Sequence, residues 1–461
     1  MRITAPIALL LANAAAFAAA PGVGDAWRAA QAHDPAYAAA QAQRDAGRAQ
    51  AAEGRALWLP SVSATGSTGR GDLRSSTQGA WFAAPGFGST NGVAFRTSIR
   101  DGTATRWAIT AEQPLFDLGR LADSTARKDA AHSAESRYSA VQQELMVRTA
   151  RSYFGVLDAR AQLGGLRQLR AAAERARAAA QARYEAGDIA ATDMREATAA
   201  ADAIAVQELD ARAALTLAEA DFSDLTGLDA ATLADLPEGA TADMPAPEPL
   251  EIWTQRALEN SPQLAIARLA LKTAQAEVTC NAALASPQLS LVAQVANDQL
   301  HGDGDFGYAE VNGRNASIGV QATIPLFTGG MRSARRHEAR AQERAAQAAL
   351  EGAELQVRQQ VRSSYLALVN AAARVQALQR LRASAASRLA ATQLGADIGD
   401  RTTVDLLNAQ ADAMRADADF RHAQAEWLLA GLQLGVSAGQ LTTAGLDEID
   451  RRLQAAGAAA N

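Results

Sequence analysis

The sequence predicts a mainly α-helical fold that carries membrane β-hairpins and is built from two copies of one unit. Of its 13 prolines, none lies between Pro114 and Pro237 or after Pro325, so two very long segments contain no helix breaker. Apolar side chains recur along both segments at helical spacing. Between the prolines that the two copies share, apolar residues alternate instead, which is typical of strands.

Composition and charge narrow the functional classes. The 44 basic and 50 acidic side chains give a net charge of −6, so nucleic acid is not expected as a partner. Apolar residues make up 48% of the chain but aromatic residues only 5%, a mixture typical of long, closely packed helices. The single cysteine, Cys280, excludes a disulfide framework and a CxxC site. Its Ala- and Leu-rich surroundings predict a buried, inert thiol.

The first 18 residues have the pattern of a secretory signal peptide. Arg2 precedes the apolar run 7–12, and Ala16-Phe17-Ala18 supplies a cleavage site. No later stretch of about 18 uncharged apolar residues follows, so no transmembrane helix is expected in the mature chain. Since no cysteine lies near the cleavage site, we expect no lipid anchor there. The chain is therefore expected in the periplasm or the outer membrane.

The predicted elements follow one another in the same order in both copies. Asp34-Pro35 matches Ser261-Pro262. The offset between the copies falls from 227 residues, at Pro60 and Pro287, to 211, at Pro114 and Pro325, which predicts an insertion in the first hairpin. The predicted ranges are a signal peptide at 1–18; a first repeat at 19–235, with a helix, a hairpin at about 60–114, a long helix at 118–184 and a helix at 190–226; a linker at 236–249; a second repeat at 250–446, with a helix, a hairpin at about 287–325, a long helix at 329–396 and a helix at 402–435; and a C-terminal tail at 447–461.

The hairpins have the features of outer-membrane strands. Leu289, Leu291 and Val295 alternate mostly with small or polar residues. The chain has 6 Trp, 6 Tyr and 10 Phe, 22 aromatic residues in all, and ten of them fall within 58–116 and 287–327, as aromatic girdles would require. Hairpins of a soluble sheet would show a similar preference. Four strands are too few to close a barrel, since the smallest use about eight, so several chains are expected to share one.

Taken together, these features resemble the TolC family of outer-membrane channel-tunnels over residues from about 25 to 446. The resemblance is carried by two Pro-Leu-Phe junctions, followed by Leu118-Gly119 and Gly329-Gly330, and by the paired turns 187–193 and 399–405. It implies a homotrimer in which four strands per chain form a 12-stranded barrel in the lipid of the cell outer membrane, continued by a long α-helical barrel through the periplasm. A helix over 118–184 would be about 100 Å long, which is a periplasmic length.

The resemblance further implies a passive exit duct for type I secretion, with no chemistry of its own. Its implied partners are an inner-membrane ABC transporter, a periplasmic membrane-fusion adaptor and an exported protein substrate of the RTX-toxin kind. The lack of a lipid-anchoring cysteine favours this branch of the family. A multidrug efflux channel is the alternative within transport, and a soluble periplasmic coiled-coil scaffold is the alternative from another class.

Residue by residue, the resemblance also implies a gate at the two helix–helix turns. Asp193 and Arg401 match a latch between inner and outer helices, and Ala396 replaces the latch tyrosine. Asp405 matches the first acidic position of an aperture ring, and Asn408 replaces the second, so we expect a weaker latch and a less acidic aperture. Alternatively, Asp193 and Asp405 only cap or solvate helix starts. The remaining implied positions are the turn glycines Gly187 and Gly399 and the strand-to-helix junction residues Pro114, Phe116, Pro325 and Phe327.

No enzyme, cofactor or metal site is predicted. The segment from Gly302 to Gly307 fits GxGxxG, but it lies in a hairpin loop with acids where a pyrophosphate would bind. Asp303 and Asp305 could contact Ca²⁺ there or form an exposed acidic loop. The arginines of 332–344 could form a solvated helix face or pair between helices. The histidines, which show no ligand spacing, are His33, His132, His301, His337 and His422.

Overall fold

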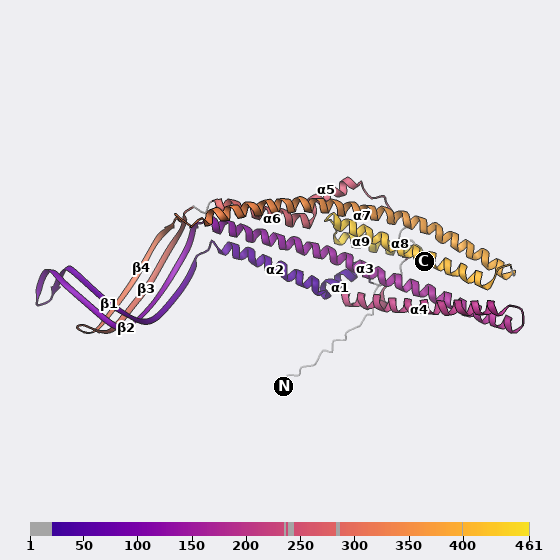
Figure 1. Cartoon of the computed structure of the whole chain (residues 1–461), viewed down its shortest axis with the longest axis horizontal. Helices are drawn as coiled ribbons and strands as arrows, with labels where there is room; N and C mark the ends of the chain where they lie inside the picture. The colour runs from indigo at the N-terminus through magenta and orange to yellow at the C-terminus, as the bar shows by residue number, and fades with distance from the viewer. Residues whose placement is uncertain (1–20, 235–236, 238–243, 283–285, 399, 461) are drawn as a thin grey trace, which may run out of the picture. The chain divides into compact units, whose positions relative to one another are not determined.

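The computed structural model describes residues 21–234, 237, 244–282, 286–398 and 400–460 (Figure 1). The predicted signal peptide, much of the predicted linker and Gly399 lie outside these residues. The chain forms two compact units. The helical unit contains the described residues of Met1–Asp45, Ala134–Arg268 and Ala349–Asn461, and the strand unit contains those of Ala46–Ser133 and Leu269–Ala348.

A proline separates two short helices at the start of each copy. These helices are α1 (Val23–His33) and α2 (Pro35–Ala56) in the first copy, and α5 (Leu250–Asn260) and α6 (Pro262–Ala282) in the second. Proline suits the first position of a helix because its ring presets φ and it has no N–H to leave unpaired. The residue before each proline caps the following helix. Ala36 N donates to Asp34 Oδ1 (2.8 Å) and Leu264 N donates to Ser261 Oγ (3.5 Å).

The proline-free segments form the two longest helices, α3 (Leu118–Glu185) with 68 residues and α7 (Met331–Asp397) with 67. Each is followed by a returning helix, α4 (Ala191–Thr226) or α8 (Thr403–Ser437). A short 3₁₀ turn, η1 (Ala230–Thr232), follows α4. Among the described residues, no helix is both long and apolar enough to cross a membrane.

The two hairpins form one antiparallel sheet of order β1-β2-β3-β4. Its strands are β1 (Ser61–Ala84), β2 (Gly88–Phe116), β3 (Gln288–Gly304) and β4 (Gly307–Thr323). The copies join through β2 and β3, where Ile109 lies opposite Val295. Cross-strand partners share a face. The apolar face carries Val62, Ala64, Ile109, Ala111, Leu291, Ala293, Val295, Ile318 and Val320, and the polar face carries Ser63, Thr65, Arg106, Thr110, Gln294, Asp298 and Ser317.

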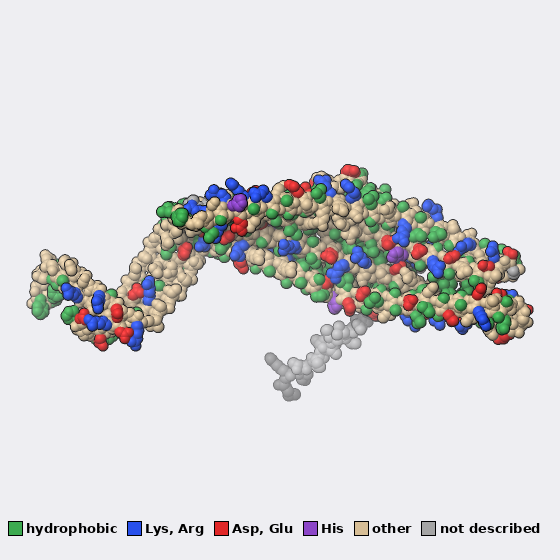
Figure 2. Space-filling view, in the orientation of Figure 1, with side chains coloured by type: hydrophobic (Ala, Val, Ile, Leu, Met, Phe, Trp, Pro, Cys, Tyr) green, Lys and Arg blue, Asp and Glu red, His purple; other side chains and the backbone are tan. Residues whose placement is uncertain are grey.

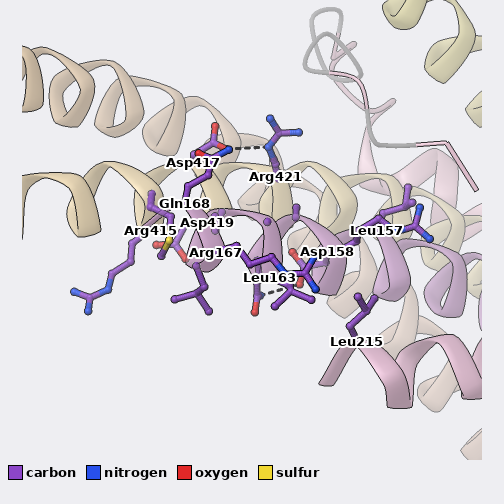
Figure 3. A pocket seen from close by; sticks show the side chains of 18 of the residues that line it. Leu157, Asp158, Leu163, Arg167, Gln168, Leu215, Arg415, Asp417, Asp419 and Arg421 are labelled. Atoms are coloured by element: carbon purple, nitrogen blue, oxygen red, sulfur yellow. Dashed lines mark hydrogen bonds and ion pairs between the residues drawn. The ribbon is translucent and has the colours of Figure 1, made fainter. Parts of the chain in front are cut away.

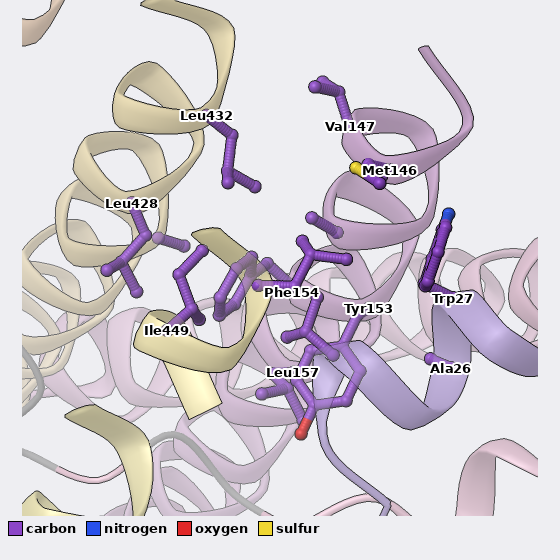
Figure 4. Close-up of a cluster of buried hydrophobic side chains, with 14 of the residues drawn as sticks. Ala26, Trp27, Met146, Val147, Tyr153, Phe154, Leu157, Leu428, Leu432 and Ile449 are labelled. Carbon is purple, nitrogen blue, oxygen red and sulfur yellow. The ribbon is translucent and has the colours of Figure 1, made fainter. Parts of the chain in front are cut away.

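The core of the helical unit lies where helices of both copies meet. Phe154 of α3 is 1% exposed and packs with Leu428 of α8 and Ile449 of helix α9 (Thr443–Ala460) (Figure 4). Trp27 of α1 belongs to the same cluster. The first and last described helices are therefore held by one core.

The C-terminus differs from the tail expected at 447–461, because most of that range is helix α9. Leu446 and Ile449, one helical turn apart, are buried in the core. The Asp450 carboxylate accepts hydrogen bonds from Val23 N (2.7 Å) and Gly24 N (2.9 Å) at the start of α1. Burial raises the pKa of Asp450. The long-range contacts that order this segment have no local sequence signal.

The strand-to-helix junctions differ between the copies. Pro114 and Phe116 still belong to β2, whereas Pro325 and Phe327 follow the end of β4 at Thr323. The side chain of Phe327 is 87% exposed. Cys280 is only partly buried, and its Sγ lies 3.6 Å from the carbonyl oxygen of Leu118. The thiol is thus less buried than predicted, and the burial it does have raises its pKa, which favours the protonated form.

Candidate functional site at the helix–helix turns

The turn between α3 and α4 is closed by a glycine. Gly187 has a φ of +82°, a conformation that other residues adopt only with strain. Asp188 N donates to Arg183 O (2.8 Å) and Gly187 N donates to Tyr184 O (3.0 Å), the two bonds of a Schellman ending. The next helix begins after Ala190, whose side chain cannot cap it. Asp193 lies in the first turn of α4, where its negative charge favours the helix dipole.

The turn between α7 and α8 shares one of these hydrogen bonds and adds a cap. Asp400 N donates to Gly395 O (2.8 Å), as Asp188 N does to Arg183 O in the first copy. Thr402 caps α8: Asp405 N donates to Thr402 Oγ1 (3.0 Å), and Thr402 N donates to Asp405 Oδ2 (3.0 Å). This reciprocal pair satisfies two backbone donors at the helix start. The hydrogen bond from Thr402 N is the main cause that holds the pKa of the Asp405 carboxyl below its usual value, with further contributions from the Thr402 side chain and the Arg401 charge.

Asp405 and Asn408 lie near the start of α8, and Asp405 is half-buried. Leu407, between them, is 5% exposed and packs in a cluster with Leu169 of α3 and Ile204 of α4. Asn408 is exposed. Asp405 therefore takes part in capping α8, as the capping alternative expected. Its carboxylate is also exposed, which a pore-lining residue requires.

The structure does not bring Asp193 and Arg401 together as an ion pair within the described chain. The Asp193 carboxylate accepts a hydrogen bond from the neighbouring hydroxyl of Thr192 (3.3 Å). Arg401 lies against the backbone of Gly395, where an added Cβ would be 2.7 Å from the Arg401 Cγ. Both latch candidates are exposed, so a contact between them requires another subunit or another conformation.

Charged side chains that the sequence analysis did not single out fix the first helical hairpin. Glu208 of α4 is 5% exposed and lies among three arginines. Its carboxylate is 2.8 Å from Arg170, 3.0 Å from Arg212 and 3.9 Å from Arg167. The hydrogen bond from Arg170 is the main cause that lowers the pKa of Glu208. Because two of these arginines come from α3, the cluster ties α4 to α3.

A hollow of about 690 Å³ lies between α3, α4 and α8 (Figure 3). At its edge, His422 of α8 bridges Asp158 of α3 (3.2 Å) and Glu426 (3.2 Å), and Glu426 also pairs with Arg374 of α7 (2.8 Å). Burial raises the pKa of Asp158. Asp158 and His422 lie 264 residues apart, so no sequence spacing could have indicated this link between the copies.

The other candidate clusters do not form a site of their own. Asp305 pairs with Arg100, and its backbone N–H donates to Ser98 Oγ (2.8 Å). In the described part of the chain, no group of three His, Cys, Asp or Glu side chains is placed to hold a metal ion. Arg332 donates to the carbonyl oxygen of Leu326 (2.9 Å), and basic side chains gather over the start of α7 (Figure 2).

Comparison with known proteins matches both copies. The sequence model of the outer membrane efflux protein family matches residues 27–228 and 253–440. TolC of Vibrio cholerae is 27% identical over 95% of this chain and 95% of its own. The alkaline protease secretion protein AprF of Pseudomonas aeruginosa is 29% identical over 97% of this chain and 89% of its own. The proteases secretion protein PrtF of Dickeya chrysanthemi is 27% identical over 94% and 92%.

Solved structures show the same fold. The crystal structure of a membrane protein from Pseudomonas aeruginosa superimposes with a TM-score of 0.72, at 19% identity, over 90% of this chain and 93% of its own. The outer membrane protein VceC of Vibrio cholerae has a TM-score of 0.70, at 16% identity, over 90% and 96%.

Proposed function

We propose that this chain, which belongs to the outer membrane efflux protein family, is the exit duct of a type I secretion system. It is a TolC-like channel protein of the cell outer membrane. The observation that carries the proposal is that two relatives named for protease secretion, AprF and PrtF, match it over almost their whole length. Its relatives are channels rather than enzymes.

The sheet supports assembly as a homotrimer. Among the residues that the structure describes, β1 and β4 are the outer strands of the sheet, and each has an edge without a partner strand. Unpaired backbone groups at such edges are costly in a membrane, and only a closed barrel satisfies them. Three chains of four strands give a 12-stranded barrel, with the apolar face toward lipid and the polar face toward the lumen.

The helix–helix turns would form the periplasmic gate. We place Asp405 and Asn408 in the aperture ring, because both match ring positions of the resembled family and lie in the first two turns of α8, where Asn408 is exposed. Asp193 and Arg401 would form the latch across subunits. An inner-membrane ABC transporter and a periplasmic adaptor would deliver the exported protein to this end.

The test is the composition of the culture medium with and without the gene. Deletion should remove one or a few proteins from the supernatant, plasmid-borne wild type should restore them, and drug susceptibility should stay unchanged. Increased susceptibility with an unchanged supernatant would instead support multidrug efflux, the candidate favoured by TolC and by the Brucella suis efflux protein BepC, which is 28% identical over 77% of the chain. Detergent-free solubility of the mature protein would support a periplasmic scaffold and overturn the duct.

A further inference from the structure

The first hairpin continues well beyond the rest of the sheet. Its strands have 24 and 29 residues, whereas both strands of the second hairpin have 17. The pairing of β2 with β3 stops at Arg100, opposite Asp303. Residues 73–98, which we call the flap, therefore form a two-stranded ribbon past the turn between β3 and β4. The insertion predicted in the first copy thus lies at the tip of the hairpin.

A bent joint connects the flap to the sheet. The register of β1 and β2 shifts between Gly71 and Leu73, which marks a β-bulge. Asp101, in this bulge, has a φ of +46°, which is uncommon for a residue other than glycine. Its conformation is held from both sides, since the Asp101 carboxylate pairs with Arg70 (2.5 Å) and Asp101 N donates to Asp72 Oδ1 (2.6 Å). The joint is therefore a defined bend.

Three glycines let the backbones approach at this joint. A Cβ on Gly302 would lie 2.7 Å from the Cα of Gly102, and a Cβ on Gly304 would collide with the carbonyl group of Ser98. The ion pair between Arg100 and Asp305 connects β2 to the same turn. Any side chain at these glycines would push the flap away from the sheet.

The direction of the bend follows from the residues packed inside it. Ile99 is fully buried, although it lies on a sheet whose side chains are otherwise mostly exposed. Ile99 Cγ2 and Leu300 Cδ1 lie 2.5 Å and 3.1 Å from the position of a Cβ on Gly102. Leu300 belongs to the polar face, because it is two residues from Asp298, which pairs with Arg106 (3.3 Å).

A hollow of about 500 Å³ marks the inside of this bend. Its lining includes Leu73 of the flap together with Arg106, Asp298 and Leu300 of the polar face. Because the flap and the polar face line one hollow, the flap folds toward the polar face. In a membrane barrel the apolar face meets lipid, so the polar face is the lumen side.

We propose that the flap is a lid over the outer mouth of the channel, an inference that rests on the proposed function. The 12 residues of Leu73–Ala84 would reach about 40 Å at about 3.3 Å per residue. A 12-stranded barrel with a strand spacing of about 4.8 Å and a tilt of about 40° has a backbone diameter of about 24 Å. Three flaps that bend inward can therefore meet at the axis.

The tips of the flaps have side chains suited to such a meeting. Phe87 is 90% exposed and Trp81 is 68% exposed in the single chain. Three copies of each would bury one another near the threefold axis. Exposed aromatic side chains are stabilised by that burial, so the closed lid would be favoured without any bound ligand.

The experiment measures entry into the barrel from outside the cell. In a Cys280→Ser background, Gln294→Cys places a thiol on the polar face, and whole cells are treated with polyethylene glycol maleimides of increasing size. The comparison variant lacks the ribbon: residues 76–96 are replaced by Asn-Gly, which joins the opposed residues Ser75 and Thr97 in a two-residue turn. This change keeps the joint and its buried Ile99.

We expect the largest reagent that labels Gln294→Cys to be bigger without the flap. If the lid is open in about 10% of the molecules or fewer, reagents too large to pass the closed lid should label the full-length chain at least about tenfold more slowly than the flap-less chain. Gly304→Ala, which forces the joint apart without removing residues, should raise the labelling of the full-length chain in the same way. An equal size limit in the full-length, flap-less and Gly304→Ala chains, all trimeric, overturns the lid.

Failure of the proposed function gives a different result. Ser89→Cys, at the exposed tip, should label on intact cells with every reagent if the strands open at the cell surface. No labelling of Ser89→Cys overturns both the duct and the lid. Free labelling of the tip, together with one size limit for Gln294→Cys in every variant, overturns the lid alone.

Discussion

Removing one side chain of the proposed latch tests the gate most directly. Asp193→Ala is the cleaner change, because its carboxylate accepts a hydrogen bond only from the adjacent Thr192 among the contacts that the structure gives it. Arg401→Ser also removes a positive charge that acts on Asp405. If both residues belong to one link, either substitution should release it, and the double substitution should add nothing further.

The size of the effect follows from the exposure of both side chains. An exposed ion pair contributes about 0–1 kcal/mol, because solvent screens the charges and two long side chains lose freedom. One link of about 1 kcal/mol changes a closed–open equilibrium about fivefold, and three links that open together change it up to about 150-fold. Ala396 contributes no hydroxyl group to support this latch, so values near the lower end are expected.

Single-channel recordings in planar bilayers provide the assay. Both single variants should spend more time at high conductance, and cells that carry them should become more sensitive to large antibiotics. Gly187→Ala serves as a matched control at the first turn. It strains a φ of +82° without touching a charge, since nothing lies within 4 Å of an added Cβ. Unchanged conductance in Asp193→Ala and Arg401→Ser, with trimer and surface level intact, refutes the latch.

Three further predictions concern assembly, the aperture and the strand unit. The protein extracted in detergent should have the mass of a trimer, and a stable monomer would contradict the shared barrel. Asp405→Asn should reduce cation selectivity, whereas Thr402→Ala, which removes only the cap and costs about 1 kcal/mol, should preserve it; equal effects would assign Asp405 to capping alone. Because the folded pKa of Asp405 lies below the ordinary 3.8, its selectivity and its capping should persist at neutral and mildly acidic pH and be lost only as the pH falls below that value. Lys272→Ala leaves the carboxylate of Asp129, 2% exposed and 2.8 Å from the lysine Nζ, without its partner. Lys272→Ala should lower the free energy of unfolding by about 3 kcal/mol, which is the low end for breaking a buried pair because Lys272 is 60% exposed. Adding Asp129→Asn should restore part of this loss. A purely steric effect of the lysine substitution would show no such recovery.

The features that could be predicted from the sequence are those with local physical causes. Proline breaks the interior of a helix, so its absence from two long segments predicted α3 and α7. Alternation of apolar residues sets the face of a strand, so the second hairpin could be placed within a few residues. The cap at Thr402 also has a local signal, a threonine three residues before an acid, and helix capping by Asp405 was one of the two alternatives expected there.

The features that could not be predicted depend on contacts across the sequence. Helix α9 is ordered by a core assembled from α1, α3 and α8, and Asp450 meets Val23 427 residues away. The bend of the flap depends on Ile99 meeting Leu300, which come from different copies. Glu208 is a common helix residue until two arginines of α3 surround it. Sequence spacing cannot predict such long-range contacts, because neither partner stands out within its own segment.

The departures from the internal duplication indicate where control should reside. In a trimer of a duplicated chain, equivalent helices and strands occur six times around one axis. A channel wall made only of such equivalent units has no element that could close the channel. The copies differ most at the strand tips, where only the first has a flap, and at the helix–helix turns, where only the second has the cap of Thr402 and Asp405. In the proposed trimer, each of these features would occur three times rather than six. Elements that occur once per chain can narrow the opening of a channel. Three of them can converge on the axis, while the equivalent positions of the other copy keep the wall continuous. We therefore expect the channel to be narrowed at the flap and at the capped turn.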